Sequence, residues 1–177
     1  MAQHVLVLGG ARSGKTTFSE QMALRLGTSP LYLATSEALD EEMAARVDAH
    51  RRARDERFIT VEEPLALSET ILASAGRHDV ILVDCLTLWM TNLLAAGSDV
   101  ALEVNNLAVT LMETNATRVI LVSNEVGLGV VPENALARSF RDLAGTAHQR
   151  LAEVCEEVHF IVAGLPMTLK GHSAKLD

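Results

Sequence analysis

The feature that most constrains the fold of this chain is a glycine-rich segment directly after a short apolar run. Residues 9–16 read G-G-A-R-S-G-K-T, and they follow the run from Val5 to Leu8. A glycine-rich turn between a buried strand and a helix directs several backbone N–H groups at one point, which the positive N-terminus of the helix also faces. The segment therefore predicts a phosphate-binding loop, or P-loop, and with it an α/β fold.

The residues of this loop predict a nucleoside triphosphate as the ligand and Mg²⁺ as the metal. Lys15 is expected to reach the β- and γ-phosphates and to act in catalysis, and the Thr16 hydroxyl is expected to bind Mg²⁺. The metal ion would bridge the same phosphates and neutralise charge that develops during phosphoryl transfer. The whole loop is expected to contact the nucleotide, namely Gly9, Gly10, Ala11, Arg12, Ser13, Gly14, Lys15 and Thr16.

Short aliphatic runs recur along the chain and are separated by segments long enough for helices. This alternation predicts a parallel sheet, and the continuous apolar runs indicate strands that are covered on both faces. We expect a doubly wound, mostly parallel sheet with helices on both faces and a ligand at the carboxyl ends of the strands. The predicted strands are 5–8, 31–34, 58–61, 80–83, 119–122 and 158–163. The predicted helices are 15–26, 37–54, 65–75, 86–95, 100–113 and 133–156, with Pro64 in the first turn of the third.

Length and charge limit the domain organisation and the class of ligand. The 177 residues suffice for one compact core, so we expect a single P-loop domain over 1–177 with a loosely held polar tail at 167–177. The net charge of −8 gives no overall basic field for nucleic acid, so a small ligand in a local cationic pocket is expected. No apolar stretch is long enough to span a membrane, and Cys85 and Cys155 are interpreted as buried thiols, which together favour a cytoplasmic protein without membrane insertion.

An acid stands where another apolar strand is predicted to end. Asp84 follows the run from Val80 to Val83, and P-loop enzymes hold Mg²⁺ from this position, either directly or through water. We therefore expect Asp84 to face Thr16 across the nucleotide site. The alternative is that Asp84 caps the helix predicted to begin at Leu86, which is a common use of aspartate.

A histidine flanked by arginines is the next candidate. If 37–54 is helical, Arg46, His50 and Arg54 lie along one ridge, because they are four residues apart. Two neighbouring cations disfavour the imidazolium form of His50, which leaves a neutral ring nitrogen able to attack phosphorus. Two alternatives remain open, an ordinary solvated charged face and a phosphate-binding lid formed by 51–57. The other histidines lack such neighbours, namely His4, His78, His148, His159 and His172.

Further motifs accompany the loop in both halves of the chain. In the first half they are Y-L-A-T-S at 32–36, E-M-A-A-R-V-D-A-H at 42–50, V-E-E-P at 61–64, D-C-L-T at 84–87 and T-N-L-L at 91–94. In the second half they are S-N-E-V-G-L-G-V-V-P-E-N at 123–134, R-S-F-R-D-L-A-G at 138–145 and Q-R-L-A at 149–152. Together with 9–16, these segments resemble the bifunctional adenosylcobinamide kinase and adenosylcobinamide-phosphate guanylyltransferase family of cobalamin biosynthesis, over nearly the whole chain.

The resemblance implies two reactions on one substrate. The first is phosphorylation of the aminopropanol hydroxyl of adenosylcobinamide by ATP or GTP. In the second, the family's nucleophile, which falls on His50, attacks the α-phosphorus of GTP and releases pyrophosphate. The resulting guanylyl-histidine passes GMP to adenosylcobinamide phosphate and gives adenosyl-GDP-cobinamide. The family's remaining nucleotide contacts fall on Ala34, Thr35, Ser36, Arg51, Arg52, Ala53, Arg54, Glu62 and Asp84.

The resemblance also implies a homotrimer, with the predicted helix 133–156 as a contact surface. Glu125 follows a predicted strand at the ligand-bearing edge, so it is a candidate contact for the corrinoid substrate, with a plain surface acid as the alternative. The chain departs from the family pattern in lacking an Arg-Pro turn after His50 and in having Asp84 where many members have glutamate.

Two other functions are compatible with the P-loop. A single-activity small-molecule or nucleotide kinase would use Lys15, Thr16 and Asp84 for phosphoryl transfer, with 51–57 closing as a lid. A GTP-dependent switch protein would bind protein partners. The switch is disfavoured because the guanine-recognition motif N-K-x-D is absent, and the most similar segment is S-N-E-V at 123–126.

Overall fold

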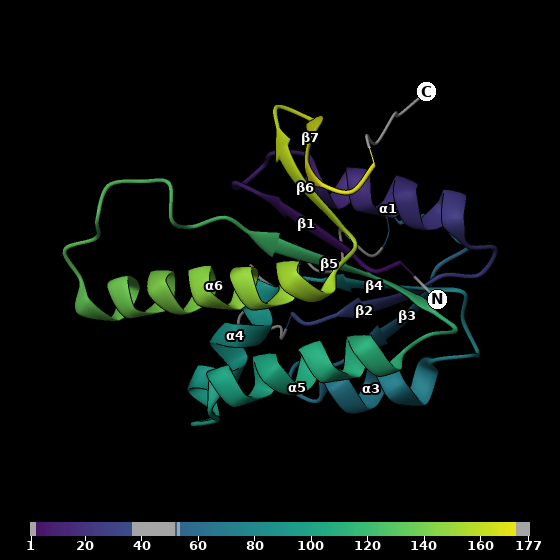
Figure 1. Cartoon of the computed structure of the whole chain (residues 1–177), viewed down its shortest axis with the longest axis horizontal. Coiled ribbons are helices and arrows are strands. Elements are labelled where there is room, and N and C mark those ends of the chain that lie inside the picture. The colour runs from purple at the N-terminus through teal and green to yellow at the C-terminus, as the bar shows by residue number, and fades with distance from the viewer. Residues whose placement is uncertain (1–2, 37–51, 53, 173–177) are drawn as a thin grey trace.

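A seven-stranded sheet forms the centre of the computed structural model, which describes residues 3–36, 52 and 54–172 (Figure 1). The strand order is β3-β2-β4-β5-β1-β6-β7, and every neighbouring pair is parallel except β6 and β7. The predicted doubly wound, mostly parallel sheet is therefore confirmed. The strands are β1 (Val5–Gly9), β2 (Leu31–Ala34), β3 (Ile59–Glu62), β4 (Val80–Asp84), β5 (Arg118–Asn124), β6 (Glu157–Val162) and β7 (Leu165–Lys170).

Helices cover both faces of this sheet, as the continuous apolar strands predict. One face carries α1, and the other carries α3, α4, α5 and α6 (Figure 1). Along β1, Val5 and Val7 belong to the core cluster on the α1 side, whereas Leu6 and Leu8 belong to the larger cluster under the other helices. The helices are α1 (Lys15–Leu26), α3 (Leu67–Ser74), α4 (Leu86–Ala95), α5 (Val100–Glu113) and α6 (Ala135–Val154).

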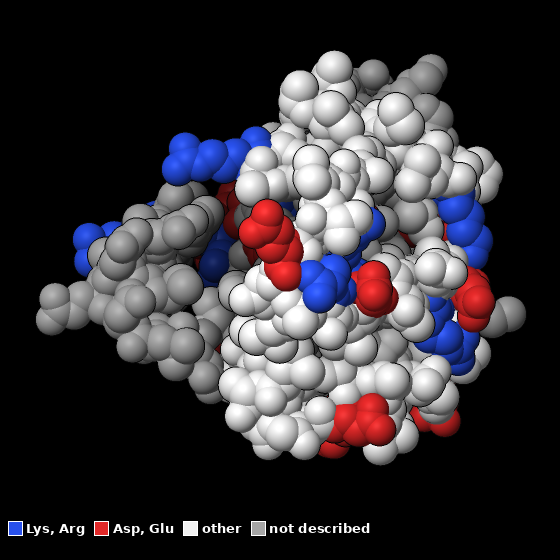
Figure 2. Space-filling view, turned by 90° about the vertical axis from the view of Figure 1, so that its left-hand side faces the viewer, with Lys and Arg blue, Asp and Glu red and all other residues white. Residues whose placement is uncertain are grey.

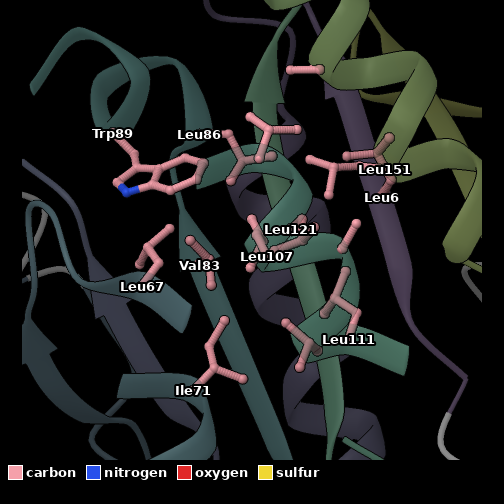
Figure 3. Close-up of a cluster of buried hydrophobic side chains, with 14 of the residues drawn as sticks. Leu6, Leu67, Ile71, Val83, Leu86, Trp89, Leu107, Leu111, Leu121 and Leu151 are labelled. Carbon is pink, nitrogen blue, oxygen red and sulfur yellow. The ribbon is translucent and has the colours of Figure 1, made fainter. Parts of the chain in front are cut away.

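The larger cluster fixes α4, which begins two residues after Asp84, on the sheet (Figure 3). Trp89 is 1% exposed, and its indole N–H donates a hydrogen bond to the carbonyl oxygen of Leu65 at 2.8 Å. Its single polar atom is thus satisfied inside the core. Leu86 and Trp89 both pack in this cluster, so the first turn of α4 holds the end of β4 in place.

The predicted bounds of α1, α4 and α5 agree with the structure, and α6 is shorter at both ends than predicted. It begins after Asn134, whose side chain accepts a hydrogen bond from the backbone N–H of Ala137 at 3.1 Å and caps the helix. The predicted helix 37–54 lies outside the described residues except for 52 and 54. Within the described part of the chain, no helix combines the length and the apolar character needed to cross a membrane.

The start of α3 differs from the prediction for a local reason. The Glu63 carboxylate accepts hydrogen bonds from the backbone N–H groups of Leu65 at 3.0 Å and Ala66 at 2.7 Å, which forms a turn before the helix. The helix therefore begins at Leu67, and the prediction that Pro64 lies in its first turn is wrong.

A strand that the sequence pattern did not predict follows β6. The prediction of a loosely held tail at 167–177 is wrong for residues 167–170, because they lie in β7. Residues 173–177 lie outside the described residues. A two-residue turn joins β6 and β7, with φ values of 51° at Ala163 and 78° at Gly164. Ala163 therefore belongs to the turn, and β6 ends one residue earlier than the predicted strand 158–163. Pro166 is tolerated because β7 is an edge strand.

The two cysteines are both buried and unpaired, as the sequence analysis expected. Cys85 is the N-cap of α4, and Cys155 follows the last residue of α6. Burial raises the pKa of the Cys155 thiol to about 12, and the neighbouring Glu156 carboxylate adds to this effect. The thiol therefore stays protonated and packs as a small apolar group.

Candidate active site

The predicted phosphate-binding loop links β1 to α1 at the carboxyl end of β1. A Cβ atom at Gly9 would lie 2.5 Å from Oγ of Ser13 and 2.8 Å from the carbonyl oxygen of Ile161, so a side chain does not fit there. Gly14 has a φ of 92°, a left-handed conformation that suits glycine. The N–H of Gly164 donates to the carbonyl oxygen of Ser13 at 2.8 Å, so the β6–β7 turn braces the loop.

Lys15 and Thr16 lie at the start of α1, where the loop ends. The Lys15 ammonium is inside the loop, since Nζ donates to the carbonyl oxygen of Gly10 at 3.0 Å and the residue is buried. The Thr16 hydroxyl donates to Oδ2 of Asp84 at 3.0 Å, which joins the loop to the end of β4. Asp84 thus faces Thr16 as expected and does not cap α4, whose N-cap residue Cys85 makes no capping side-chain hydrogen bond.

Tyr32 is a residue that the sequence analysis did not single out. Its hydroxyl donates to the same Oδ2 of Asp84 at 2.8 Å, because β2 and β4 are neighbours in register. Burial, followed by the charge of Asp84, raises the pKa of the Tyr32 hydroxyl, so the hydroxyl remains a donor. Asp84 is therefore held from two sides, by Thr16 and by Tyr32.

Arg54 lies over the same tyrosine. Its guanidinium carbon is 3.3 Å from the centroid of the Tyr32 ring, a cation–π contact, and Nη1 donates to Oγ1 of Thr60 at 2.8 Å. Nε is also 3.9 Å from the Glu20 carboxylate. Arg54 is thus fixed beside the predicted nucleotide site.

A cavity of about 810 Å³ opens along the carboxyl ends of β2, β3, β4 and β5 and the phosphate-binding loop. This volume lies within the range of nucleotide and other small-molecule sites. Most of the predicted site residues line it, namely Ala11, Arg12, Ser13, Gly14, Lys15, Thr16, Ala34, Ser36, Arg54, Glu62, Asp84 and Glu125. The structure therefore brings together residues that are separated by more than a hundred positions in the sequence.

The remaining predicted site residues either do not line the cavity or lie outside the described residues. Gly9 and Gly10 do not line the cavity. Thr35 is buried, and its hydroxyl donates to the carbonyl oxygen of Cys85 at 2.8 Å and accepts from the N–H of Cys85 at 2.8 Å, so it joins β2 to the end of β4. Arg52 is exposed and does not line the cavity. The predicted residues His50, Arg51 and Ala53 lie outside the described residues.

The oxygen atoms of Thr16 and Asp84 form a pair that suits Mg²⁺. This ion prefers hard oxygen ligands and in nucleotide sites takes most of its other ligands from phosphate and water. Among the residues that the structure describes, no group of three or more His, Cys, Asp or Glu side chains could hold a metal ion on its own. The pair fits an ion that arrives with a nucleotide.

Glu125 and His148 form a second polar group at the cavity. Glu125 follows β5, and its N–H donates to the carbonyl oxygen of Gly9 at 2.9 Å, which holds it beside the loop. Nδ1 of His148 lies 3.8 Å from Oε2 of Glu125, and Nε2 lies 2.8 Å from Oγ of Ser123. Burial lowers the pKa of His148, and the Glu125 carboxylate opposes this effect.

His148 was not a candidate from the sequence because it lacks the flanking arginines of His50. The signal that could have found it is its place on α6. The buried residues of that helix are Ala144, Ala147, His148 and Leu151, so a histidine interrupts an otherwise apolar stripe.

Comparison with known proteins identifies relatives along almost the whole chain. The model of the cobinamide kinase / cobinamide phosphate guanyltransferase family matches residues 5–169. A bifunctional adenosylcobalamin biosynthesis protein, CobP of Pseudomonas aeruginosa, is 48% identical over 167 residues, which cover 94% of this chain and 96% of that protein. CobU of Escherichia coli, with the same description, is 40% identical over 183 aligned residues, which cover 94% of this chain and 99% of that protein.

Solved structures support the fold alone. A protein of Pyrococcus horikoshii OT3 superposes with a TM-score of 0.57 at 12% identity, over 97% of this chain and 87% of that one. An ATPase of a bacterial type III secretion system superposes with a TM-score of 0.58 at 10% identity, over 94% of this chain and 56% of that one.

Proposed function

This chain belongs to the cobinamide kinase / cobinamide phosphate guanyltransferase family, and we propose that it catalyses the following two successive reactions. It phosphorylates the aminopropanol hydroxyl of adenosylcobinamide with ATP or GTP. It then transfers GMP from GTP to adenosylcobinamide phosphate through a guanylyl-histidine at His50, giving adenosyl-GDP-cobinamide. Family membership favours this bifunctional enzyme over the single-activity kinase and the switch protein.

The contact between Thr16 and Asp84 is the observation that carries the kinase half. It joins the phosphate-binding loop to the end of β4 at 3.0 Å, beside the buried Lys15. Thr16 and Asp84 would hold Mg²⁺, which supplies charge neutralisation at the phosphates when bound. Lys15 would stabilise the negative charge on the transferring phosphoryl group, and the backbone N–H groups of the loop would orient the phosphate chain.

The position of Arg54 supports the guanylyl-transfer half. Arg54 is fixed over Tyr32 at the cavity, and His50 precedes it by four residues. Glu62, which also lines the cavity, is the proposed acceptor for the guanine N1–H and 2-amino groups.

The products of a single incubation test the proposed function. We expect the purified chain, given adenosylcobinamide, Mg²⁺ and GTP, to form first adenosylcobinamide phosphate and then adenosyl-GDP-cobinamide, as identified by mass spectrometry. Accumulation of the phosphate alone would contradict the second reaction and support the single-activity kinase. Recovery of unchanged adenosylcobinamide would contradict both.

Replacing Asp84 by asparagine is expected to slow both reactions about 10–100-fold at limiting Mg²⁺, because both use a triphosphate held with the metal ion. The variant keeps a side chain of the same size but loses the charge that faces Thr16. The rates of both half-reactions should be measured across a series of Mg²⁺ concentrations. Tyr32→Phe, which removes only the second contact to Asp84, is the matched control and should lose much less. Unchanged Mg²⁺ dependence in Asp84→Asn would contradict the proposed metal site.

The proposed homotrimer is supported by apolar surface that one chain leaves exposed. The segment between β5 and α6 carries Leu128 at 80% exposure and Val130 at 95%, and residues 133–139, which lead into and begin α6, are all exposed. This segment projects at the left-hand side of Figure 1, and the face seen from that side is covered mainly by uncharged side chains with isolated charges of both signs (Figure 2). Exposed apolar surface of this kind typically marks an interface.

Introducing a charge on this surface is expected to dissociate the trimer. Leu128→Asp should reduce the mass measured by light scattering from about three times the 19.1 kDa of one chain to that of a single chain. Leu72→Asp on α3, where the leucine is 48% exposed, is the matched control and should leave the mass unchanged. A wild-type mass equal to one chain, or a Leu128→Asp variant that stays trimeric, would contradict this interface.

A further inference from the structure

Glu125 is held at the wall of the cavity, next to the phosphate-binding loop. It follows β5, the strand that pairs with β1, and its N–H bonds to the carbonyl oxygen of Gly9. Its side chain is 21% exposed and lines the cavity, while Oε1 accepts a hydrogen bond from the N–H of Gly127. The carboxylate is therefore both fixed in orientation and open to a ligand.

His148 lies behind the other carboxylate oxygen, on the inner side of the cavity wall. Its Nε2 atom is 2.8 Å from the Ser123 hydroxyl, and its Nδ1 atom faces Oε2 of Glu125 at 3.8 Å. Two tautomers of the neutral ring are available, and only the one with the proton on Nδ1 presents a positive N–H rather than a lone pair to the carboxylate. Ser123 then donates its hydroxyl proton to Nε2, so each polar atom of the buried ring has a favourable partner.

The other carboxylates of the cavity are less suited to accept a proton from a substrate at the γ-phosphate. Oδ2 of Asp84 already accepts hydrogen bonds from Thr16 and Tyr32. Glu62 ends β3, which is four strands from β1 in the sheet order, or about 19 Å at a strand spacing of about 4.8 Å. Glu125 directly follows β5, the strand that pairs with β1 beside the loop.

We propose that Glu125 is the catalytic proton acceptor of the kinase reaction and that His148 is the positioning residue that orients its carboxylate. This role rests on the kinase half of the proposed function. The substrate O–H bond breaks while the oxygen forms a bond to the γ-phosphorus, and the proton passes to the Glu125 carboxylate. The bond from the γ-phosphorus to the bridging oxygen breaks, and the nucleoside diphosphate leaves with its electron pair. Guanylyl transfer has no substrate hydroxyl to deprotonate, so it does not need Glu125.

Glu125→Gln tests the catalytic role, because glutamine keeps the size of the side chain and an acceptor for Gly127 but is a far weaker base. The kcat for phosphorylation of adenosylcobinamide should fall about 10²–10⁴-fold. The rate at which GTP labels the protein with GMP, measured in the same preparation, should fall far less, so the ratio of the two rates is the readout. Equal losses in both reactions would overturn the role of Glu125. Absence of phosphorylation by the wild-type protein would instead contradict the kinase proposal itself.

Two variants of His148 test the positioning role. His148→Leu removes the donor, and the kcat for phosphorylation should fall about 10–100-fold while the KM for adenosylcobinamide changes little, because the base is misplaced rather than lost. His148→Asn keeps an N–H group at the place of Nδ1 and should recover most of this kcat. If both variants lose activity equally, or if the loss appears in KM and in guanylylation as well, His148 supports only the packing of α6.

Discussion

Lys15→Ala is expected to abolish phosphorylation of adenosylcobinamide. Lys15 is buried, and its ammonium lies 3.0 Å from the carbonyl oxygen of Gly10, inside the loop that surrounds the phosphates. A cation in such a desolvated place stabilises the charge on the transferring group much more than a cation in water would. Losses of about 10³–10⁵-fold are typical when a positive side chain is removed from a phosphoryl-transfer site, and we expect kcat/KM to fall by this amount.

The measurement is the initial rate of adenosylcobinamide phosphate formation, with Lys170→Ala as the matched control. Lys170 is exposed on β7, and its ammonium bonds only to the carbonyl oxygens of Ala152 and Glu153 among the contacts that the structure describes, so its removal should leave the rate unchanged. If Lys15→Ala retained a rate within tenfold of the wild type, the loop would serve some step other than transfer of the γ-phosphoryl group.

His50→Ala is expected to abolish the second reaction and to spare the first. Without its nucleophile, a covalent mechanism has no intermediate, and losses of about 10⁴-fold or more in the rate of guanylyl transfer are expected. Phosphorylation depends on Lys15, Thr16 and Asp84, so the variant should accumulate adenosylcobinamide phosphate. Both rates should be measured on one preparation by mass spectrometry of the corrinoid products.

His172→Ala is the matched control for this variant, because His172 is an exposed histidine near the end of the described chain. It should leave both rates unchanged. A His50→Ala protein that forms adenosyl-GDP-cobinamide at the wild-type rate would contradict the assignment of the nucleophile, even though the chain would still be a guanylyltransferase.

Local sequence patterns were sufficient for the loop and for six of the seven strands. The glycines, Lys15 and Thr16 are fixed by their spacing to a strand and a helix, so the phosphate-binding loop could be located without knowledge of any distant contact. Asp84 could be placed opposite Thr16 because the carboxyl ends of parallel strands meet at one edge. The strand order, by contrast, depends on pairings between distant segments, and the sequence analysis did not predict it.

Two of the missed features depend on contacts between segments far apart in the sequence. Tyr32 lies within an ordinary apolar run, and only the register of β2 with β4 brings its hydroxyl to Asp84. His148 and Ser123 are 25 positions apart and meet only because α6 packs on the sheet. The β6–β7 hairpin, a local element, was missed because the polar segment 167–177 was interpreted as a loosely held tail, and an edge strand such as β7 accepts both polar residues and Pro166.

Labelling with GTP tests the central claim most directly. The wild-type chain should be incubated with Mg²⁺ and GTP that carries a label on the α-phosphate, without any corrinoid, and then digested for peptide mass spectrometry. We expect a covalent GMP adduct on the peptide that contains His50, stable in base and labile in acid as a phosphoramidate is, and discharged when adenosylcobinamide phosphate is added. The absence of labelled protein, or a label on a peptide without His50, would contradict the proposed mechanism.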